Sequence, residues 1–209
     1  MVYKLYYFDI RGRAEPIRQL LALGHQPYED VRISAEEWPA FKSKTPLGSM
    51  PFMEIDGIKL GQSLAIMRFL GHKFNRAGSC PMEEAKLNMI ADTIQDFLNQ
   101  EGPAKLSYVI MGIIKISKEE FYKTKIVPAI EIYAPIINNF LRENGSKGVF
   151  VGDRETWTDV FAAEVFCRLV DFVNPHCIDA YPEIKALIKR VHSLPEIKKY
   201  LEQRKPSIC

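Results

Sequence analysis

The first 75 residues alternate between strand-like and helix-like patterns of apolar positions. The runs "VYKLYYF" and "PYEDVRI" are rich in aromatic and β-branched residues, which predicts two strands. The runs "MPFMEI" and "IKLG" flank Asp56-Gly57, a pair typical of a tight hairpin turn, and predict two more. Helical spacing predicts helices in "AEPIRQLLALG" and "LAIMRFLGHKF". A capping-box pattern from Ser34 to Glu37 predicts a short helix in "SAEEWPAFKSK". The predicted order is strand, helix, strand, helix, hairpin, helix.

This order predicts a four-stranded mixed sheet, since one right-handed βαβ unit is followed by a β-hairpin and a helix. The arrangement βαβαββα is thioredoxin-like, but the chain has no CxxC pair for dithiol chemistry. Beyond it the apolar pattern is almost wholly helical. We therefore predict an α/β domain over residues 1–76, a linker over 77–82 and an all-α helical bundle over 83–209.

Two helix starts carry capping signals. Ser63 precedes the helix after the hairpin and is predicted to be its N-cap. Thr156 and Asp159 in "TWTD" have the spacing of a capping box at the start of a further helix. Pro128 and Pro135 lie within one long helical run and mark places where it can break or kink. Asp159 is therefore predicted to be structural.

Composition and charge exclude several classes of function. Hydrophobic residues make up 47% and charged residues 26%, the mix of a globular protein, and a net charge of +2 does not favour nucleic acid as a partner. No stretch approaches the roughly 18 apolar residues of a membrane span, and the N-terminus lacks the features of a signal peptide. The cysteines show no metal-ligand spacing, so we predict free thiols, no metal and a reducing, cytoplasmic compartment. They are Cys80, Cys167, Cys177 and Cys209.

Three features of the first domain have candidate chemistry. Met50-Pro51 stands at a strand start, where an X-Pro bond can be cis, although a trans turn proline is the commoner case. Gln62-Ser63 opens a helix whose N–H groups suit a carboxylate, although a plain capping serine has the same pattern. Tyr6 and Tyr7 end the first strand near Arg13, and strand alternation places them on opposite faces. Only one of the two tyrosines can therefore face a bound anion, and the spacing does not say which.

Together these motifs resemble a known family. "YKLYYFDIRGRAEPIR", "EEWPAFKSKTPLGSMPFMEIDG", "QSLAIMRFL", "ADTIQDF" and "TWTDVFAAE" occur in the order found in cytosolic glutathione transferases of the sigma class. That class also contains the glutathione-dependent prostaglandin D synthases. The resemblance covers essentially the whole chain and implies a homodimer with glutathione as co-substrate.

The resemblance implies a role for individual residues. Tyr7 matches the catalytic tyrosine, Arg13 the active-site arginine and Pro51 the cis-proline. Asp96 matches an aspartate that reaches the glutathione of the partner subunit across the dimer interface. The remaining glutathione contacts match Trp38, Lys42, Met50, Gln62 and Ser63. The pocket for the electrophile matches Phe8, Ile10, Arg13 and Phe161, with the tail near Ile208 as a possible cover.

Three positions depart from the family pattern. Glu155 stands where the family commonly has an apolar residue before the capping box. Ser49 replaces a lysine often found before the Met50 position, and Pro103-Ala104 replaces a tryptophan of the prostaglandin synthases. The last change implies a roomier pocket.

The resemblance leaves three functions to compare. We expect conjugation of glutathione to small hydrophobic electrophiles, a detoxification reaction, together with reduction of organic hydroperoxides. The alternatives are a prostaglandin D isomerase and a carrier of hydrophobic ligands such as hematin.

Overall fold

The structure, a computed structural model, describes residues 2–207, so Ile208 and Cys209 lie outside the described residues. The chain divides into two compact units. The first holds residues 2–75 together with residues 194–207, and the second holds residues 76–193.

The first unit is built on a four-stranded mixed sheet. Its strands are β1 (Tyr3–Phe8), β2 (Glu29–Ile33), β3 (Phe52–Ile55) and β4 (Ile58–Gly61), in the order β2-β1-β3-β4. β1 pairs parallel with β2 and antiparallel with β3, and β3 pairs antiparallel with β4. The predicted thioredoxin-like order is confirmed.

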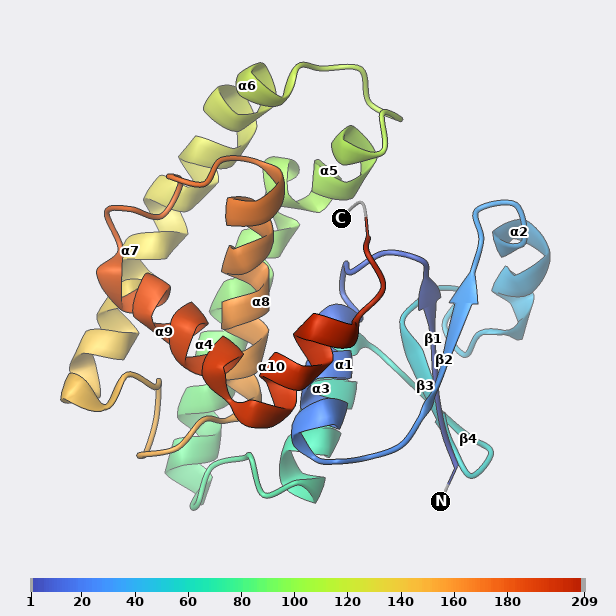
Figure 1. The fold of residues 1–209 in the computed structure, drawn as a ribbon, viewed down its shortest axis with the longest axis horizontal. Helices are drawn as coiled ribbons and strands as arrows, with labels where there is room; N and C mark the ends of the chain where they lie inside the picture. Colours follow the sequence, from blue (N-terminus) through green and yellow to red (C-terminus); the bar gives the residue numbers. More distant parts are fainter. Residues whose placement is uncertain (1, 208–209) are drawn as a thin grey trace. The chain divides into compact units, whose positions relative to one another are not determined.

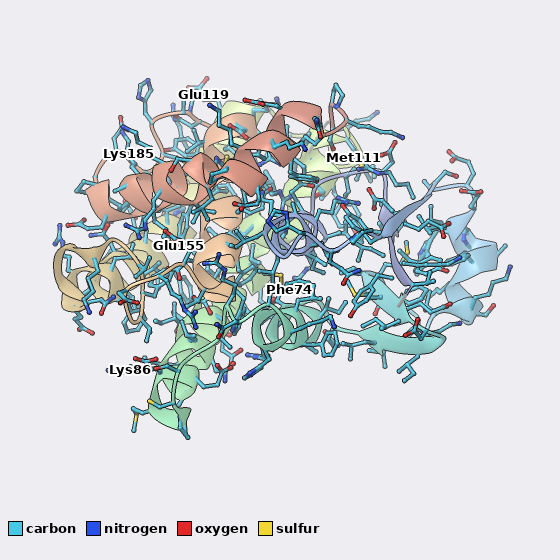
Figure 2. The ribbon with its side chains drawn as sticks, turned by 60° about the horizontal axis from the view of Figure 1, so that its bottom comes forward. Phe74, Lys86, Met111, Glu119, Glu155 and Lys185 are labelled. Atoms are coloured by element: carbon cyan, nitrogen blue, oxygen red, sulfur yellow. The ribbon has the colours of Figure 1, made fainter. Side chains whose placement is uncertain are left out.

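Three helices accompany this sheet. They are α1 (Glu15–Leu23), α2 (Trp38–Phe41, followed by a 3₁₀ turn over Lys42–Lys44) and α3 (Ser63–Lys73). Figure 1 shows α1 and α3 on one side of the sheet and α2 on the other. Gly24 is the C-cap of α1, and a Cβ atom there would lie 2.5 Å from the ring of Phe74, which follows α3 and is labelled in Figure 2. The glycine thus lets the ends of α1 and α3 approach closely.

The last helix of the chain belongs to the first unit. α10 (Pro195–Gln203) packs beside α1, and its Ile197 is buried. The predicted helical domain extended to residue 209, whereas residues 194–207 pack with the sheet unit. The physical reason is that Tyr200 and Arg204 donate hydrogen bonds to Glu15 of α1. The periodicity of apolar residues along a helix does not predict such contacts.

The second unit is helical throughout. Its helices are α4 (Pro81–Asn99), α5 (Glu101–Ile110), α6 (Lys118–Phe121), a π-helical turn (Tyr122–Ile126), α7 (Val127–Glu143), a 3₁₀ turn (Gly145–Lys147), α8 (Trp157–Phe172) and α9 (Pro182–Ser193). α8 is buried along most of its length and packs against α4 and α9. The predicted fold class, a thioredoxin-like unit with a helical unit, is confirmed.

α5 begins with residues that are not typical of a helix. Gly102 and Pro103 stand in its first turn, a pair that is more typical of a loop. Gly102 is needed there because a Cβ atom would lie 2.2 Å from the carbonyl oxygen of Lys125. Pro128 falls in the first turn of α7, and Pro135 lies inside α7 without ending it.

The capping box at the start of α8 is present. The Asp159 carboxylate accepts the Thr156 backbone N–H at 2.8 Å, the Thr156 hydroxyl at 2.6 Å and the Phe150 backbone N–H at 2.9 Å. Glu155, labelled in Figure 2, forms an ion pair with Arg190, with 2.6 Å between Glu155 Oε1 and Arg190 Nε. An ion pair therefore occupies the position where the family places an apolar residue.

No helix among residues 2–207 has both the length and the apolar character needed to cross a bilayer.

Candidate functional site

The two adjacent tyrosines of β1 lie on opposite faces of the sheet, as strand alternation predicts. Tyr3, Leu5 and Tyr7 are buried, and the residues between them are only half-buried. Tyr6 stacks on Phe52 with ring centroids 4.4 Å apart and on Phe41 at 5.9 Å, so its face is that of α2. Burial raises the pKa of Tyr6, which keeps its hydroxyl protonated. The Tyr6 ring therefore packs in an aromatic cluster with Phe41 and Phe52.

Tyr7 is held at the end of its strand by the loop that follows. The Arg13 backbone N–H donates to the Tyr7 hydroxyl at an N···O distance of 3.1 Å. Gly12 has a positive φ of 43°, and a Cβ atom there would lie 2.5 Å from the Tyr7 oxygen. The loop therefore closes around the Tyr7 hydroxyl only because residue 12 has no side chain.

We predict that Gly12→Ala displaces the Tyr7 hydroxyl and lowers kcat at least tenfold, since both the added methyl group and the left-handed backbone oppose the native geometry. Steady-state kinetics of the reaction that the resemblance implies, conjugation of glutathione to an electrophile, measure kcat in each variant. Gly57→Ala is the matched control, because Gly57 also has a positive φ (87°) but its Cβ would meet nothing within 4 Å. Equal losses of kcat in both variants would contradict the contact with Tyr7.

Other predicted residues of the first unit surround this strand end. Phe8 packs edge-on against Trp38 with ring centroids 5.5 Å apart and also contacts Tyr7 at 5.7 Å. Ile10 is buried in the loop after β1, and Arg13 is half-buried. Lys42 is exposed in the 3₁₀ turn after α2. Phe8 at the strand end therefore contacts both Tyr7 and Trp38 of α2.

The segment before β3 and the start of α3 show two special backbone conformations. The Met50–Pro51 peptide bond is cis. Gln62 has a φ of 67°, in the left-handed region that a non-glycine residue seldom adopts. The left-handed conformation of Gln62 is of a kind that clusters at binding sites, where the surrounding structure enforces it.

The predicted N-cap of α3 is wrong by one residue. Gln62 occupies the N-cap position, and Ser63 is the first helical residue and is buried. Ser63 therefore lies among the unpaired N–H groups of the first turn, where the helix dipole favours an anion.

Two predicted site residues belong to the second unit. Asp96 is exposed on α4, and Phe161 is buried on α8. Cys80, Cys167 and Cys177 are free thiols. Within residues 2–207, no group of three or more His, Cys, Asp or Glu side chains is placed to hold a metal ion.

Sequence reasoning missed some residues that shape this site. In the sequence, Gly12 between Arg11 and Arg13 is typical of a turn and carries no other signal. Glu15 and Arg18 face inward from α1 and are buried, although the helical pattern gives charged residues no such role. Their signal is weak in a single sequence, because an arginine near a glutamate is also typical of an exposed helix face.

Comparison with known proteins identifies the family. The profile described as "Glutathione S-transferase, N-terminal domain" matches residues 3–72, and the profile described as "Glutathione S-transferase, C-terminal domain" matches residues 114–204. The chain is 51% identical over 203 residues to a probable glutathione S-transferase, gst-36, of Caenorhabditis elegans, covering 97% of each chain.

Solved structures agree with these matches. The fold is similar to that of the monomeric glutathione S-transferase Na-GST-3 of Necator americanus, with 42% identity, a TM-score of 0.91 and 99% of each chain covered. A Nu-class glutathione S-transferase of Haemonchus contortus gives 38% identity and a TM-score of 0.85, covering 100% of this chain and 99% of that one. Prostaglandin synthase D of Nilaparvata lugens gives 32% identity and a TM-score of 0.83, covering 99% of this chain and 100% of that one. The chain therefore belongs to the glutathione S-transferase family.

Proposed function

We propose that this glutathione transferase binds glutathione beside Tyr7 and holds its thiol as a thiolate that attacks small hydrophobic electrophiles. The observation that carries the proposal is the hydrogen bond from the Arg13 N–H to the Tyr7 hydroxyl, in the loop that Gly12 allows to close around that hydroxyl. A phenol oxygen that accepts a hydrogen bond is a stronger donor through its own proton, because neighbouring hydrogen bonds polarise one another.

The energetics suit a hydrogen bond of this kind. A free thiol has a pKa of about 8.5 and is mostly protonated at neutral pH. Lowering that pKa by about 2 units requires about 2.7 kcal/mol of extra stabilisation of the thiolate. A hydrogen bond from a neutral donor to a charged acceptor contributes about 1.5–3 kcal/mol. One tyrosine hydroxyl in a favourable environment is therefore of the right size.

The remaining contacts would position the substrate. By the family resemblance, the Met50 backbone pairs with the cysteinyl part of glutathione, and Gln62 with Ser63 binds its γ-glutamyl carboxylate. Trp38 and Lys42 hold the glycine end. The positive end of the α3 dipole at Ser63 suits a carboxylate. Catalysis would then consist of orienting the thiolate and replacing its hydration shell, with no covalent bond to the enzyme.

The reaction is a nucleophilic displacement or addition. With an aryl chloride, the thiolate sulfur forms a C–S bond and chloride leaves with the bonding electron pair. With an organic hydroperoxide, the thiolate sulfur would attack the terminal oxygen, forming an S–O bond as the O–O bond breaks, and the alkoxide that leaves would take up a proton to give the alcohol. A second glutathione thiol would then displace the hydroxyl group of the sulfenic acid, giving glutathione disulfide and water. Phe8, Ile10 and Phe161 are the apolar residues proposed to contact the electrophile.

We expect purified protein with glutathione to form a thioether from a chloronitrobenzene, with saturation in both substrates. The absorbance of the conjugate reports the rate, and the uncatalysed rate is subtracted. Product formation no faster than this background would contradict the proposed function.

A prostaglandin D isomerase is the second candidate, because a prostaglandin synthase D is 32% identical over essentially the whole chain. Pro103-Ala104 weighs against it, because the resemblance implies a tryptophan in this region of those enzymes. Product analysis after addition of prostaglandin H2 distinguishes the two, since the leading proposal predicts only the products of spontaneous breakdown. Carriage of hematin stays a prediction of the sequence.

We also propose the sigma class, on the ordered motifs of the sequence, and the cytoplasm, where glutathione keeps thiols such as Cys80 reduced. The Nu class of the Haemonchus contortus relative is the alternative assignment.

We further propose a homodimer in which Asp96 reaches the partner's glutathione. Asp96 is exposed on α4, as are the apolar side chains of Met82 and Met89 on the same helix. Sedimentation should therefore give about twice the chain mass of 24.0 kDa. A single species of chain mass, which would match the monomeric relative from Necator americanus, would contradict the dimer.

A further inference from the structure

A buried ion pair lies at the start of α1, directly after the loop that holds Tyr7. Glu15 is 2% exposed and Arg18 is 1% exposed, and the Arg18 Nη1 to Glu15 Oε2 distance is 3.2 Å. The resemblance assigned neither residue to the site. Charged side chains are seldom fully buried unless they are paired, so this pair has a structural or functional task.

One end of the pair holds the loop between Tyr7 and Arg13. Arg18 donates through Nη1 to the backbone carbonyl of Ile10 at 3.0 Å, a bond that is itself buried. Arg18 Nε donates to Asp30 of β2 at 3.2 Å. The side chain of Arg18 thus connects the loop to β2 and to α1.

β2 fixes the same loop a second time. Arg32 binds Asp30 through Nε at 2.9 Å, and its Nη1 pairs with Asp9, which is the first loop residue after β1. Asp30 is therefore shared by Arg18 and Arg32. Arg18 binds the carbonyl of Ile10, and Arg32 binds the side chain of Asp9, the loop residue just before it.

The other end of the pair reaches the C-terminal segment, residues 194–207. Glu15 Oε1 accepts the Tyr200 hydroxyl at 3.1 Å and Arg204 Nη1 at 3.0 Å. Burial and the nearby Glu15 carboxylate raise the pKa of Tyr200, so its hydroxyl stays a donor. α10 and the residue that follows it are therefore attached to α1 through one carboxylate.

These contacts form a continuous path from the C-terminal segment to the loop. Tyr200 and Arg204 fix Glu15, Glu15 orients Arg18, and Arg18 holds the Ile10 carbonyl. Glu15 contacts both Arg18 and Arg204, so removal of Arg204 leaves a buried carboxylate whose charge is compensated by Arg18 alone. When Arg204 is absent, Arg18 is expected to shift toward Glu15 and away from Ile10.

We propose that Glu15 and Arg18 are positioning residues that couple docking of the C-terminal segment to the loop that places the Arg13 N–H on the Tyr7 hydroxyl. The catalytic consequence rests on the proposed function, in which Tyr7 donates to the thiolate. The coupling itself is a property of the protein without glutathione. A detached C-terminal segment then leaves glutathione binding intact and weakens activation of the thiol.

Hydrogen–deuterium exchange on the full chain without glutathione tests the coupling. Tyr200→Phe and Arg204→Met each remove one bond to Glu15 and leave the Glu15–Arg18 pair in place. We expect amide exchange in a peptide covering residues 8–14 to become at least tenfold faster in the double variant. Exchange in the β3–β4 hairpin should stay as in the wild type. Arg204→Lys should restore part of the protection.

Glu196→Gln is the matched control. It weakens the contact between Glu196 and His25 (3.4 Å), which joins α10 to the turn that follows α1 and does not involve Glu15. Its exchange over residues 8–14 should equal that of the wild type. Unchanged exchange there in the double variant would overturn the proposal, and so would an equal acceleration in the control or in the hairpin.

Kinetics separate positioning from general destabilisation. In the double variant we expect the midpoint of the pH–rate profile to rise and kcat to fall about three- to tenfold, with KM for glutathione unchanged. A higher KM with unchanged kcat and midpoint would overturn the catalytic part of the proposal. If the wild type formed no thioether, the proposed function would fail while the exchange result still decided the coupling.

Discussion

Tyr7→Phe is expected to lower kcat about 10- to 1000-fold while leaving the fold intact. The reason is that the variant lacks the hydroxyl proposed to donate a hydrogen bond to the thiolate of glutathione. Loss of one preorganised donor to an anion has an effect of this size in other enzymes. The ring of Tyr7 is buried, and phenylalanine keeps its packing against Phe8 and Gly12. KM for glutathione should change little, because the other proposed contacts with glutathione are unchanged. Steady-state kinetics at saturating glutathione give both values.

Tyr6→Phe is the internal control for this experiment. Tyr6 stands one residue earlier on the same strand and stacks on Phe41 and Phe52, on the opposite face. Its hydroxyl has no role in the proposed chemistry, so kcat should stay within about twofold of the wild type. A large loss in Tyr6→Phe, or full activity in Tyr7→Phe, would contradict the assignment.

The choice between the two tyrosines shows what the sequence alone could decide. Period-two alternation predicted that Tyr6 and Tyr7 face opposite ways, and the burial pattern of β1 confirms it. Periodicity did not say which face meets a substrate, since that depends on where α2 and the loop after β1 lie. The family resemblance favoured Tyr7, and the Arg13 N–H bond to its hydroxyl supports that choice.

Other features follow the same division between local and long-range determinants. The Asp56-Gly57 turn and the Thr156–Asp159 box depend on neighbouring residues, and both are present. Gly102 next to Pro103 is typical of a loop. The reason for a glycine in this helix is the close approach of the Lys125 carbonyl, which is distant in sequence. The attachment of α10 to α1 through Glu15 is equally long-range, so residues 194–207 were assigned to the helical domain.

Asp159→Ala is expected to destabilise the protein by about 3 kcal/mol at pH 7.5, through loss of a buried cap and its bond to the Phe150 N–H. Asp159 is fully buried, and its removal leaves the Thr156 and Phe150 N–H groups without this acceptor. Urea unfolding followed by circular dichroism, at fixed protein concentration, measures the difference. Asp153→Ala is the control, because Asp153 is exposed in the preceding loop and its loss should matter by less than about 0.5 kcal/mol.

The same pair of proteins tests the protonation state of Asp159. Burial raises the pKa of Asp159 to about 6 from an ordinary value of 3.8, more than its hydrogen bonds lower it. The folded protein therefore binds a proton that the unfolded chain releases between those two values. This contribution to stability is fully present below pH 3.8 and is lost as the pH rises through about 6.

The stability gap between wild type and Asp159→Ala should accordingly widen by about 1 kcal/mol when the pH falls from 7.5 to 5.0. Unfolding curves at both pH values measure it. A gap that narrows on acidification would mean that the hydrogen bonds outweigh burial and hold the carboxylate ionised.

The central claim is that the Tyr7 hydroxyl holds the thiol of glutathione as a thiolate. The ultraviolet absorbance of thiolate in the enzyme–glutathione complex, titrated against pH, measures it directly. We predict a thiol pKa about 2 units below the free value of about 8.5 in the wild type and in Tyr6→Phe, and a return toward the free value in Tyr7→Phe. The same lowered pKa in Tyr7→Phe as in the wild type would contradict the claim.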